Sequence, residues 1–189
     1  MTHIVLNVPG LGGSGPTHWQ SRWEALYPEC RRVEQCNWNI PDRNDWLDAL
    51  DASILACETP PVVVAHSLGC ALLARWASRR NSAPIAAALM VAPADVDSRD
   101  TIPAEALCFG PMPLGVLPFP TTVVASTNDP YVEMHRAKVF ATAWGADFHN
   151  LGAVGHINAD SHLDTWDTGW TLLGDLRTSI GSGTVAREA

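Results

Sequence analysis

The sequence predicts a domain of the α/β class, in which a mostly parallel sheet is covered by helices on both faces. Three observations support this prediction: the length of the chain, its composition, and the alternation of short apolar runs with longer stretches of helical spacing. At 189 residues the chain has the length of one domain. Its 47% hydrophobic and 17% charged residues exclude a disordered or fibrous chain. We expect the domain to span residues 1–180, and the small, polar residues 181–189 to form a flexible tail.

Six apolar runs are expected to form the strands of the sheet. They cover residues 3–8, 32–36, 61–66, 85–91, 121–126 and 146–151. The third run contains Pro61-Val62-Val63-Val64-Ala65, which is apolar on both faces, as a central parallel strand must be. Because helical stretches separate the runs, successive strands are expected to pair in parallel through crossover connections.

Five stretches between the runs carry helical spacing. They cover residues 18–27, 42–57, 68–80, 130–144 and 162–180. In the second stretch Trp46, Leu47, Leu50, Ile54 and Leu55 share one face, which is typical of a helix that packs against a core. Residues 93–120 interrupt the alternation with six prolines. We expect them to form a long surface excursion that is too short for a separate lid domain.

The charge balance limits the partners of the protein. Its 12 basic and 20 acidic residues give a net charge of −8, which repels phosphate backbones and anionic membrane surfaces. We therefore expect no nucleic-acid and no membrane partner. The apolar runs are also far shorter than the roughly 20 residues that cross a bilayer. The five cysteines are scattered without a zinc spacing and the first residues lack a secretory signal, so we expect a reduced, cytoplasmic protein without a metal site.

The most informative segment lies where the third strand meets the following helix. It reads Ala65-His66-Ser67-Leu68-Gly69, the small-x-Ser-x-Gly pattern of a nucleophile elbow. The turn must be tight, so the positions two residues before and after the serine must be small; here an alanine replaces the commoner first glycine. Such a turn lifts the hydroxyl of Ser67 clear of the sheet. The alternative is that Ser67 only caps the helix.

A serine nucleophile needs a base that is held by an acid, and after such an elbow the acid precedes the histidine along the chain. Asp129 follows the fifth strand, at the carboxyl edge where sites of open α/β sheets gather. His156 follows the sixth strand in a glycine-rich loop. We therefore predict Ser67, Asp129 and His156 as nucleophile, acid and base. Asp129 precedes Pro130 and also fits a helix N-cap, and both roles can hold at once.

Other residues compete for these roles or extend the site. Asp95 and Asp97 follow the fourth strand and are alternative acids. His66 adjoins the nucleophile, but successive side chains at a strand end diverge, so His66 is badly placed to take the proton. His18 follows the loop after the first strand and can either face the substrate or begin a helix. We count His18 and the neighbouring Trp19 among the residues expected to bind substrate.

Two backbone N–H groups are expected to stabilise the negative charge that develops in the reaction. One belongs to Leu68, directly after the nucleophile, and the other to Leu11 in the loop after the first strand. Gly10 and Gly12 flank Leu11 and let the backbone turn toward the site without a Cβ in the way. We therefore expect both glycines to contribute to substrate binding.

The same loop also supports a different class of function. Gly10-x-Gly12-x-x-Gly15 after a first strand matches the dinucleotide-binding fingerprint, and Glu34 lies near the spacing of its ribose-binding acid. Pro16, however, removes an N–H from the turn that should face the phosphates. Two more strand-like residues also follow Glu34, although the fingerprint acid should close its strand. A nicotinamide-dependent oxidoreductase is therefore the weaker alternative.

Several motifs occur together along the chain. They are Pro9-Gly10-Leu11-Gly12-Gly13-Ser14, Pro16-Thr17-His18-Trp19-Gln20, Trp23-Glu24, Ala65-His66-Ser67-Leu68-Gly69, Ser126-Thr127-Asn128-Asp129-Pro130 and Gly155-His156-Ile157-Asn158. As a set they resemble the small serine hydrolases of the retinoblastoma-binding protein nine and YdeN type. The resemblance covers the chain up to about Leu173.

The resemblance implies a compact α/β-hydrolase fold with little or no cap and a triad of Ser67, Asp129 and His156. It also implies hydrolysis of small esters or short amides without a metal or an organic cofactor. A binding module with an idle triad has the same motifs and is the alternative. The retinoblastoma-binding property is not transferred, because Leu55-Ala56-Cys57-Glu58 lacks one residue of L-x-C-x-E. The natural substrate, protein partners and oligomeric state are not predicted.

Overall fold

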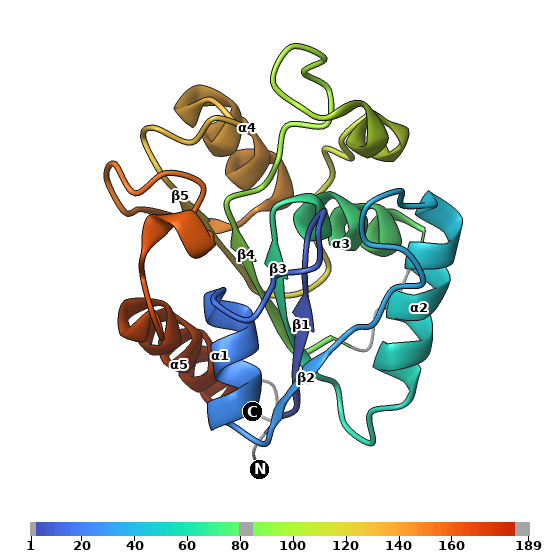
Figure 1. The fold of residues 1–189 in the computed structure, drawn as a ribbon. Helices are drawn as coiled ribbons and strands as arrows, with labels where there is room; N and C mark the ends of the chain where they lie inside the picture. The colour runs from blue at the N-terminus through green and yellow to red at the C-terminus, as the bar shows by residue number, and fades with distance from the viewer. Residues whose placement is uncertain (1–2, 80–84, 184–189) are drawn as a thin grey trace.

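A six-stranded sheet forms the centre of the computed structural model, which describes residues 3–79 and 85–183 (Figure 1). The strands are β1 (Val5–Val8), β2 (Cys30–Arg32), β3 (Val62–His66), β4 (Ala87–Val91), β5 (Thr121–Ala125) and β6 (Asp147–Asn150). They lie in the order β2-β1-β3-β4-β5-β6, and every neighbouring pair is parallel. The predicted fold class is confirmed.

Within the described residues, five α-helices cover the two faces of the sheet. They are α1 (Trp19–Leu26), α2 (Arg43–Leu55), α3 (Leu68–Ser78), α4 (Met134–Trp144) and α5 (Asp167–Gly183). The helices α1 and α5 lie side by side on one face, and α2, α3 and α4 pack on the other (Figure 1). Each face therefore buries its own hydrophobic cluster.

The strand β3 shows why the centre of the sheet is apolar on both sides. Val62 and Val64 pack in the cluster under α1 and α5, whereas Val63 and Ala65 pack in the cluster under the other three helices. Successive side chains of a strand point to opposite faces, so a strand covered on both faces needs an unbroken apolar run. This strand carries the serine at its carboxyl end.

The edge strand β2 begins two residues and ends four residues earlier than expected. It covers Cys30–Arg32, not residues 32–36, because Cys30 pairs with Val5 at the start of β1. Val33 still donates its N–H to the carbonyl of Asn7 at 2.8 Å, and the chain then leaves the sheet. Val33 is buried although it lies beyond the end of the strand. The apolar pattern of the sequence does not distinguish such a buried loop residue from a residue of the strand.

Two helices begin later than the spacing predicts. α4 starts at Met134, not at residue 130, after Glu133 as N-cap. α5 starts at Asp167, not at residue 162, because the short 3-10 helix η2 (Ala159–Ser161) and a turn come first. Both delays lengthen loops at the carboxyl edge of the sheet. The loops between β5 and α4 and between β6 and α5 are therefore long enough to carry the side chains of a site.

The proline-rich segment 93–120 is exposed at about half of its residues and buried at others. Ile102, Phe109, Met112 and Phe119 are buried within the cluster that also holds α3 and α4. A 3-10 helix, η1 (Ala104–Phe109), lies in the middle of the segment. Side chains outside the segment satisfy its carbonyl groups: Arg75 donates to Phe109 at 2.8 Å, and Trp144 donates to Pro113 at 2.8 Å. The segment therefore lies at the surface, as expected, but several of its side chains belong to the core, which was not predicted.

The carboxyl end of the described chain is helical. α5 ends at Gly183, inside the segment 181–189 that was expected to be a tail. Residues 184–189 lie outside the described residues, so the tail stays a prediction. Among residues 3–79 and 85–183, none of the helices combines the length and the apolar character that a membrane crossing requires.

Candidate active site

Ser67 forms the turn between β3 and α3 in a strained backbone conformation. Its φ of 55° and ψ of −121° lie in a region that residues with a side chain rarely adopt. The N–H of Ser67 donates to the carbonyl of Val91 at 3.0 Å, which holds the turn against the neighbouring strand. Ser67 occupies the N-cap position of α3, but its side chain makes no capping hydrogen bond. The capping alternative is therefore not realised.

Two glycines make this turn possible. A Cβ on Gly69 would overlap the carbonyl oxygen of Val8, so α3 can lie against the end of β1 only without a side chain there. A Cβ on Gly10 would lie 2.8 Å from the Cβ of Ser67, closer than real contacts allow. The loop after β1 therefore packs directly on the serine turn. Gly10 supports this turn and does not line the cavity described below.

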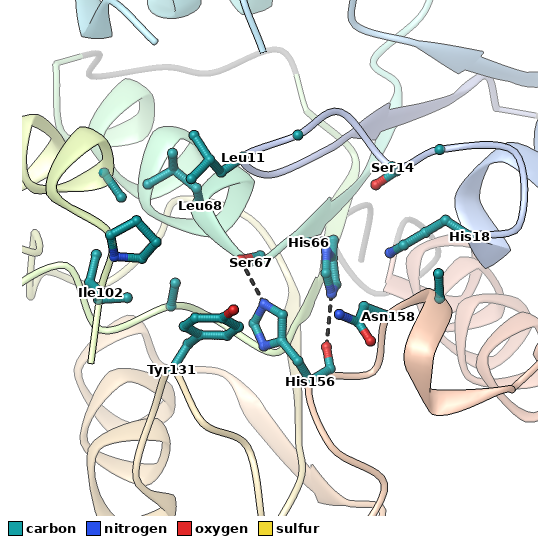
Figure 2. Close-up of a pocket in the computed structure, with 16 residues that line it drawn as sticks. Leu11, Ser14, His18, His66, Ser67, Leu68, Ile102, Tyr131, His156 and Asn158 are labelled. Carbon is teal, nitrogen blue, oxygen red and sulfur yellow. Dashed lines mark hydrogen bonds between the residues drawn. The ribbon is translucent and has the colours of Figure 1, made fainter. Parts of the chain in front are cut away.

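Three side chains that are distant in the chain meet at the carboxyl edge of the sheet. The Oγ of Ser67 donates to Nε2 of His156 at 2.8 Å (Figure 2). The Nδ1 of His156 donates to both carboxylate oxygens of Asp129, each at 2.9 Å. Because the carboxylate can only accept, this arrangement fixes the tautomer of the imidazole. The structure thus brings together all three residues that were predicted as nucleophile, base and acid.

The carboxylate of Asp129 is enclosed by protein. Its side chain is 0% exposed, and its Oδ1 also accepts the N–H of Tyr131 at 2.9 Å. Asp129 does not cap α4, whose N-cap is Glu133, so the N-cap alternative is wrong. The hydrogen bond from the N–H of Tyr131 instead holds the carboxylate of Asp129 in place beside His156.

The loop that carries His156 is tied to the loop that carries Asp129. Asn128 Oδ1 accepts the N–H of Gly155 at 2.7 Å, and Ser126 Oγ accepts the N–H of Val154 at 3.0 Å. Ser126 and Asn128 belong to one of the sequence motifs, but their positioning role was not predicted. Both residues follow β5, so they hold the base and the acid in a fixed relation.

The alternative acids are engaged elsewhere. Arg136 donates to Asp95 at 2.7 and 3.0 Å and to Asp97 at 3.0 Å. His66, the alternative base, donates from Nε2 to the carbonyl of His156 at 3.0 Å (Figure 2). Burial, reinforced by the neighbouring His18 and His156, lowers the pKa of His66 well below its ordinary value. His66 is thus a neutral donor that holds the backbone of the loop that carries His156.

His18 combines the two roles that were left open. Its Nδ1 accepts the N–H of Gln20 at 3.2 Å as the N-cap of α1, and its ring also lines the cavity. Trp19 does not line the cavity. Its indole is buried under α5 and donates to the carbonyl of Ile157 at 2.8 Å. The expectation that Trp19 contacts substrate was therefore wrong, because the helix turns this side chain toward the core.

The two predicted backbone donors, Leu11 and Leu68, both border the cavity next to Ser67. In residues 3–79 and 85–183, neither N–H donates a hydrogen bond to another group. The loop around Leu11 is held by its neighbours, since Gly12 donates to Trp38 at 2.9 Å and Gly13 donates to Gly10 at 3.1 Å. Both donors are therefore available to an oxygen beside Ser67.

A cavity of about 260 Å³ opens at Ser67 and His156. On one side Figure 2 shows apolar side chains, and on the other it shows polar ones. The apolar side is lined by Leu11, Leu68, Ile102 and Tyr131, and Ala94, Pro103 and Ala106 are further apolar residues of the lining. The polar side is lined by Ser14, His18, His66 and Asn158, and Gly12, Gly15 and Ala159 complete the lining. The sequence did not predict the wall from residues 102–106, because it depends on how the proline-rich segment folds back.

The described residues contain no group of three or more His, Cys, Asp or Glu side chains that could hold a metal ion. The glycine loop with the dinucleotide pattern lies against the serine turn, and Glu34 is exposed. The strand order, the turn at Ser67 and the loops after β5 and β6 together define an α/β-hydrolase fold.

Comparisons with known proteins agree with this class. The family model described as "Serine hydrolase" matches residues 5–175, so the chain belongs to that serine hydrolase family. Among solved structures, a putative YdeN-like hydrolase from Pectobacterium atrosepticum is 29% identical with a TM-score of 0.82, over 95% of this chain and 92% of that one. The resemblance inferred from the sequence motifs is confirmed. A search of curated proteins gave no match.

Two further structures share the fold at lower identity. The ydeN gene product from B. subtilis is 19% identical with a TM-score of 0.73, over 94% of this chain and 100% of that chain. A thermophilic esterase from Thermogutta terrifontis is 15% identical with a TM-score of 0.67, over 94% and 90% of the two chains. Family and fold favour a hydrolase over the nicotinamide-dependent oxidoreductase.

Proposed function

We propose that the protein hydrolyses small carboxylic esters, with short amides as a second substrate class, and that Ser67, His156 and Asp129 form its catalytic triad. The observation that carries the proposal is the unbroken chain of hydrogen bonds from Ser67 Oγ through His156 to Asp129, at 2.8 and 2.9 Å. A hydroxyl, an imidazole and a carboxylate in this relation activate the hydroxyl for attack on a carbonyl carbon.

The reaction follows from the positions of these atoms. Ser67 Oγ attacks the ester carbonyl while His156 Nε2 takes its proton, and the carbonyl electrons move to the oxygen. The tetrahedral intermediate then expels the alcohol, which receives the proton from Nε2 and leaves an acyl-serine. Water attacks this ester by the same steps, and release of the acid restores Ser67. Asp129 keeps the imidazole oriented and stabilises its positive charge.

The N–H groups of Leu68 and Leu11 are the donors proposed for the oxyanion. Both lie beside Ser67 and are free of other acceptors among the described residues. One such donor contributes about 3 kcal/mol of transition-state stabilisation. Gly12 lines the cavity next to Leu11 and leaves room for the substrate there.

The cavity supports small substrates. Its volume of about 260 Å³ is at the lower limit of ligand pockets, which span roughly 300–1,000 Å³. We also propose a reducing compartment, the cytoplasm, because all five cysteines are free.

A fluorophosphonate probe tests the proposal, because it reacts only with an activated serine. Wild-type protein should be labelled at Ser67, and Ser67→Ala should not be labelled while its thermal unfolding shows an intact fold. Wild-type protein that takes up no probe and hydrolyses no p-nitrophenyl ester would instead be a binding module with an idle triad.

A further inference from the structure

The side chain of His18 carries a hydrogen-bond donor, Nε2–H, that takes no part in the proposed mechanism. The side chain is 4% exposed, and its Nδ1 accepts the N–H of Gln20. In a neutral imidazole the proton is therefore on Nε2. This Nε2 is buried and has no partner among the described residues, although the ring borders the cavity. A buried donor without an acceptor destabilises a protein, so a bound group that accepts this bond is expected.

The imidazole of His18 is uncharged at neutral pH. Burial, with smaller electrostatic contributions from the neighbouring His156 and Arg32, lowers the pKa of His18 to about 3. The cavity offers no other charge, because its 16 lining residues include no Lys, Arg, Asp or Glu. Arg32 lies behind Ser14 and is already paired with Glu24 at 3.0 Å. An anionic group in the cavity would therefore lack a free counterion and would lie near the buried carboxylate of Asp129. The acceptor that fits is therefore an uncharged oxygen.

A second donor lies on the same side of Ser67. Asn158 Oδ1 accepts the N–H of Asp160 at 3.0 Å, so its amide Nδ2 remains for another acceptor. Figure 2 shows His18 and Asn158 on one side of the nucleophile, opposite Ile102 and Tyr131. A substrate that spans Ser67 thus meets hydrogen-bond donors at one end and apolar side chains at the other.

We infer that the His18 side of the cavity binds a second, uncharged carbonyl oxygen of the substrate, with His18 Nε2–H as the donor. The preferred substrates are then esters with an apolar group on one side of the scissile bond and a keto or amide carbonyl on the other. This inference rests on the proposed function, because it concerns the substrate of the same serine.

Two pairs of esters test the inference, and the members of each pair differ only by a ketone oxygen. Methyl 4-oxopentanoate and methyl pentanoate place this oxygen in the acyl chain, and 2-oxopropyl acetate and propyl acetate place it in the alcohol. The release of acid by wild-type protein, His18→Asn and His18→Gln gives kcat/KM for each ester. For each protein we compare the kcat/KM of the keto ester with the kcat/KM of its alkyl partner. The intrinsic reactivity of the two esters is the same in every variant, so a change in this ratio reports a change in the enzyme.

The two variants separate the donor from the helix cap. His18→Asn keeps a good N-cap oxygen but cannot reach the position of Nε2, whereas His18→Gln places an amide N–H near that position. We expect the ratio for one of the pairs to fall by about 3- to 10-fold in His18→Asn and to recover in His18→Gln. Fluorophosphonate labelling of both variants shows that Ser67 is still activated.

The outcomes distinguish this inference from the proposed function. Equal ratios in wild type and His18→Asn for both pairs, in enzymes that hydrolyse the esters and take up the probe, overturn the role of His18 alone. A ratio that falls equally in both variants overturns the assignment of the donor to Nε2. Wild-type protein that neither hydrolyses an ester nor reacts with the probe overturns both proposals.

Discussion

At the scale of single residues, the surroundings of each carboxylate decide which one can serve His156. Asp129 has its two oxygens on the imidazole and no exposed surface. Asp95 instead neutralises Arg136 through two hydrogen bonds. Both aspartates follow strands at the carboxyl edge of the sheet, so their places in the chain do not separate them. Their partners do.

Replacing the two aspartates in turn tests this assignment. Asp129→Asn should lower kcat/KM for p-nitrophenyl acetate by about 10⁴-fold, because an amide no longer holds the imidazole in the required tautomer. Asp95→Asn, the matched control, should change kcat/KM by less than about threefold and act mainly on thermal stability through Arg136. Similar losses of activity in the two variants would remove Asp129 from the triad.

The sequence predicted Ser67, Asp129 and His156 because each lies in a short motif at the end of a strand. Such placement depends on local spacing and on chain order, both of which a sequence shows. The wall at Ile102 was out of reach, because the proline-rich segment is held by Arg75 and Trp144 from two separate helices. The position of Trp19 depends similarly on its contact with Ile157, 138 residues further on.

At the scale of elements, β1 and the β3–α3 turn fit together without space for side chains. Gly69 of α3 lies against the backbone of Val8 at the end of β1, and Gly10 of the following loop lies against Ser67. The strain at Ser67 is thus maintained by the contact of two elements that are far apart in the chain. The predicted turn chemistry was correct here because it requires small residues, which a sequence shows directly.

A methyl group at Gly69 should be poorly tolerated. We expect Gly69→Ala to lower the free energy of unfolding by about 2 kcal/mol or more, because the backbone of Val8 must move. Gly174→Ala in α5 is the control: its Cβ meets nothing, and a helix gains about 0.5–1 kcal/mol from alanine. Urea unfolding measures both changes. A Gly69→Ala variant as stable as the wild type would show that the two elements are not tightly packed.

At the scale of the whole molecule, folding buries two neutral histidines beside the site. The pKa of His18 falls to about 3 and that of His66 falls well below its ordinary value, mainly because both rings are buried. In the unfolded chain both groups titrate near pH 6.5. Below that pH the unfolded state therefore binds protons that the folded state does not, and stability decreases as the pH falls.

This linkage predicts an acid-sensitive fold. Between pH 8 and pH 5, His18 should remove about 2 kcal/mol from the free energy of unfolding, and His66 should act in the same direction. His18→Asn eliminates one of the two groups, so its loss over this pH range should be about 2 kcal/mol smaller than that of the wild type. Urea unfolding of both proteins at the two pH values measures the difference. Parallel losses would mean that His18 is protonated in the folded protein.

Ile102 and Ala106 belong at once to the wall of the cavity and to the hydrophobic core. A substitution that widens the cavity at either residue also removes packing from the core. In this protein, a gain in the size of the esters that fit is therefore coupled to a loss of thermal stability. Directed evolution toward bulkier esters should therefore succeed sooner from a stabilised parent. Tyr131 also lines the cavity but is only half-buried against the same core, so changes there should remove less packing and cost less stability.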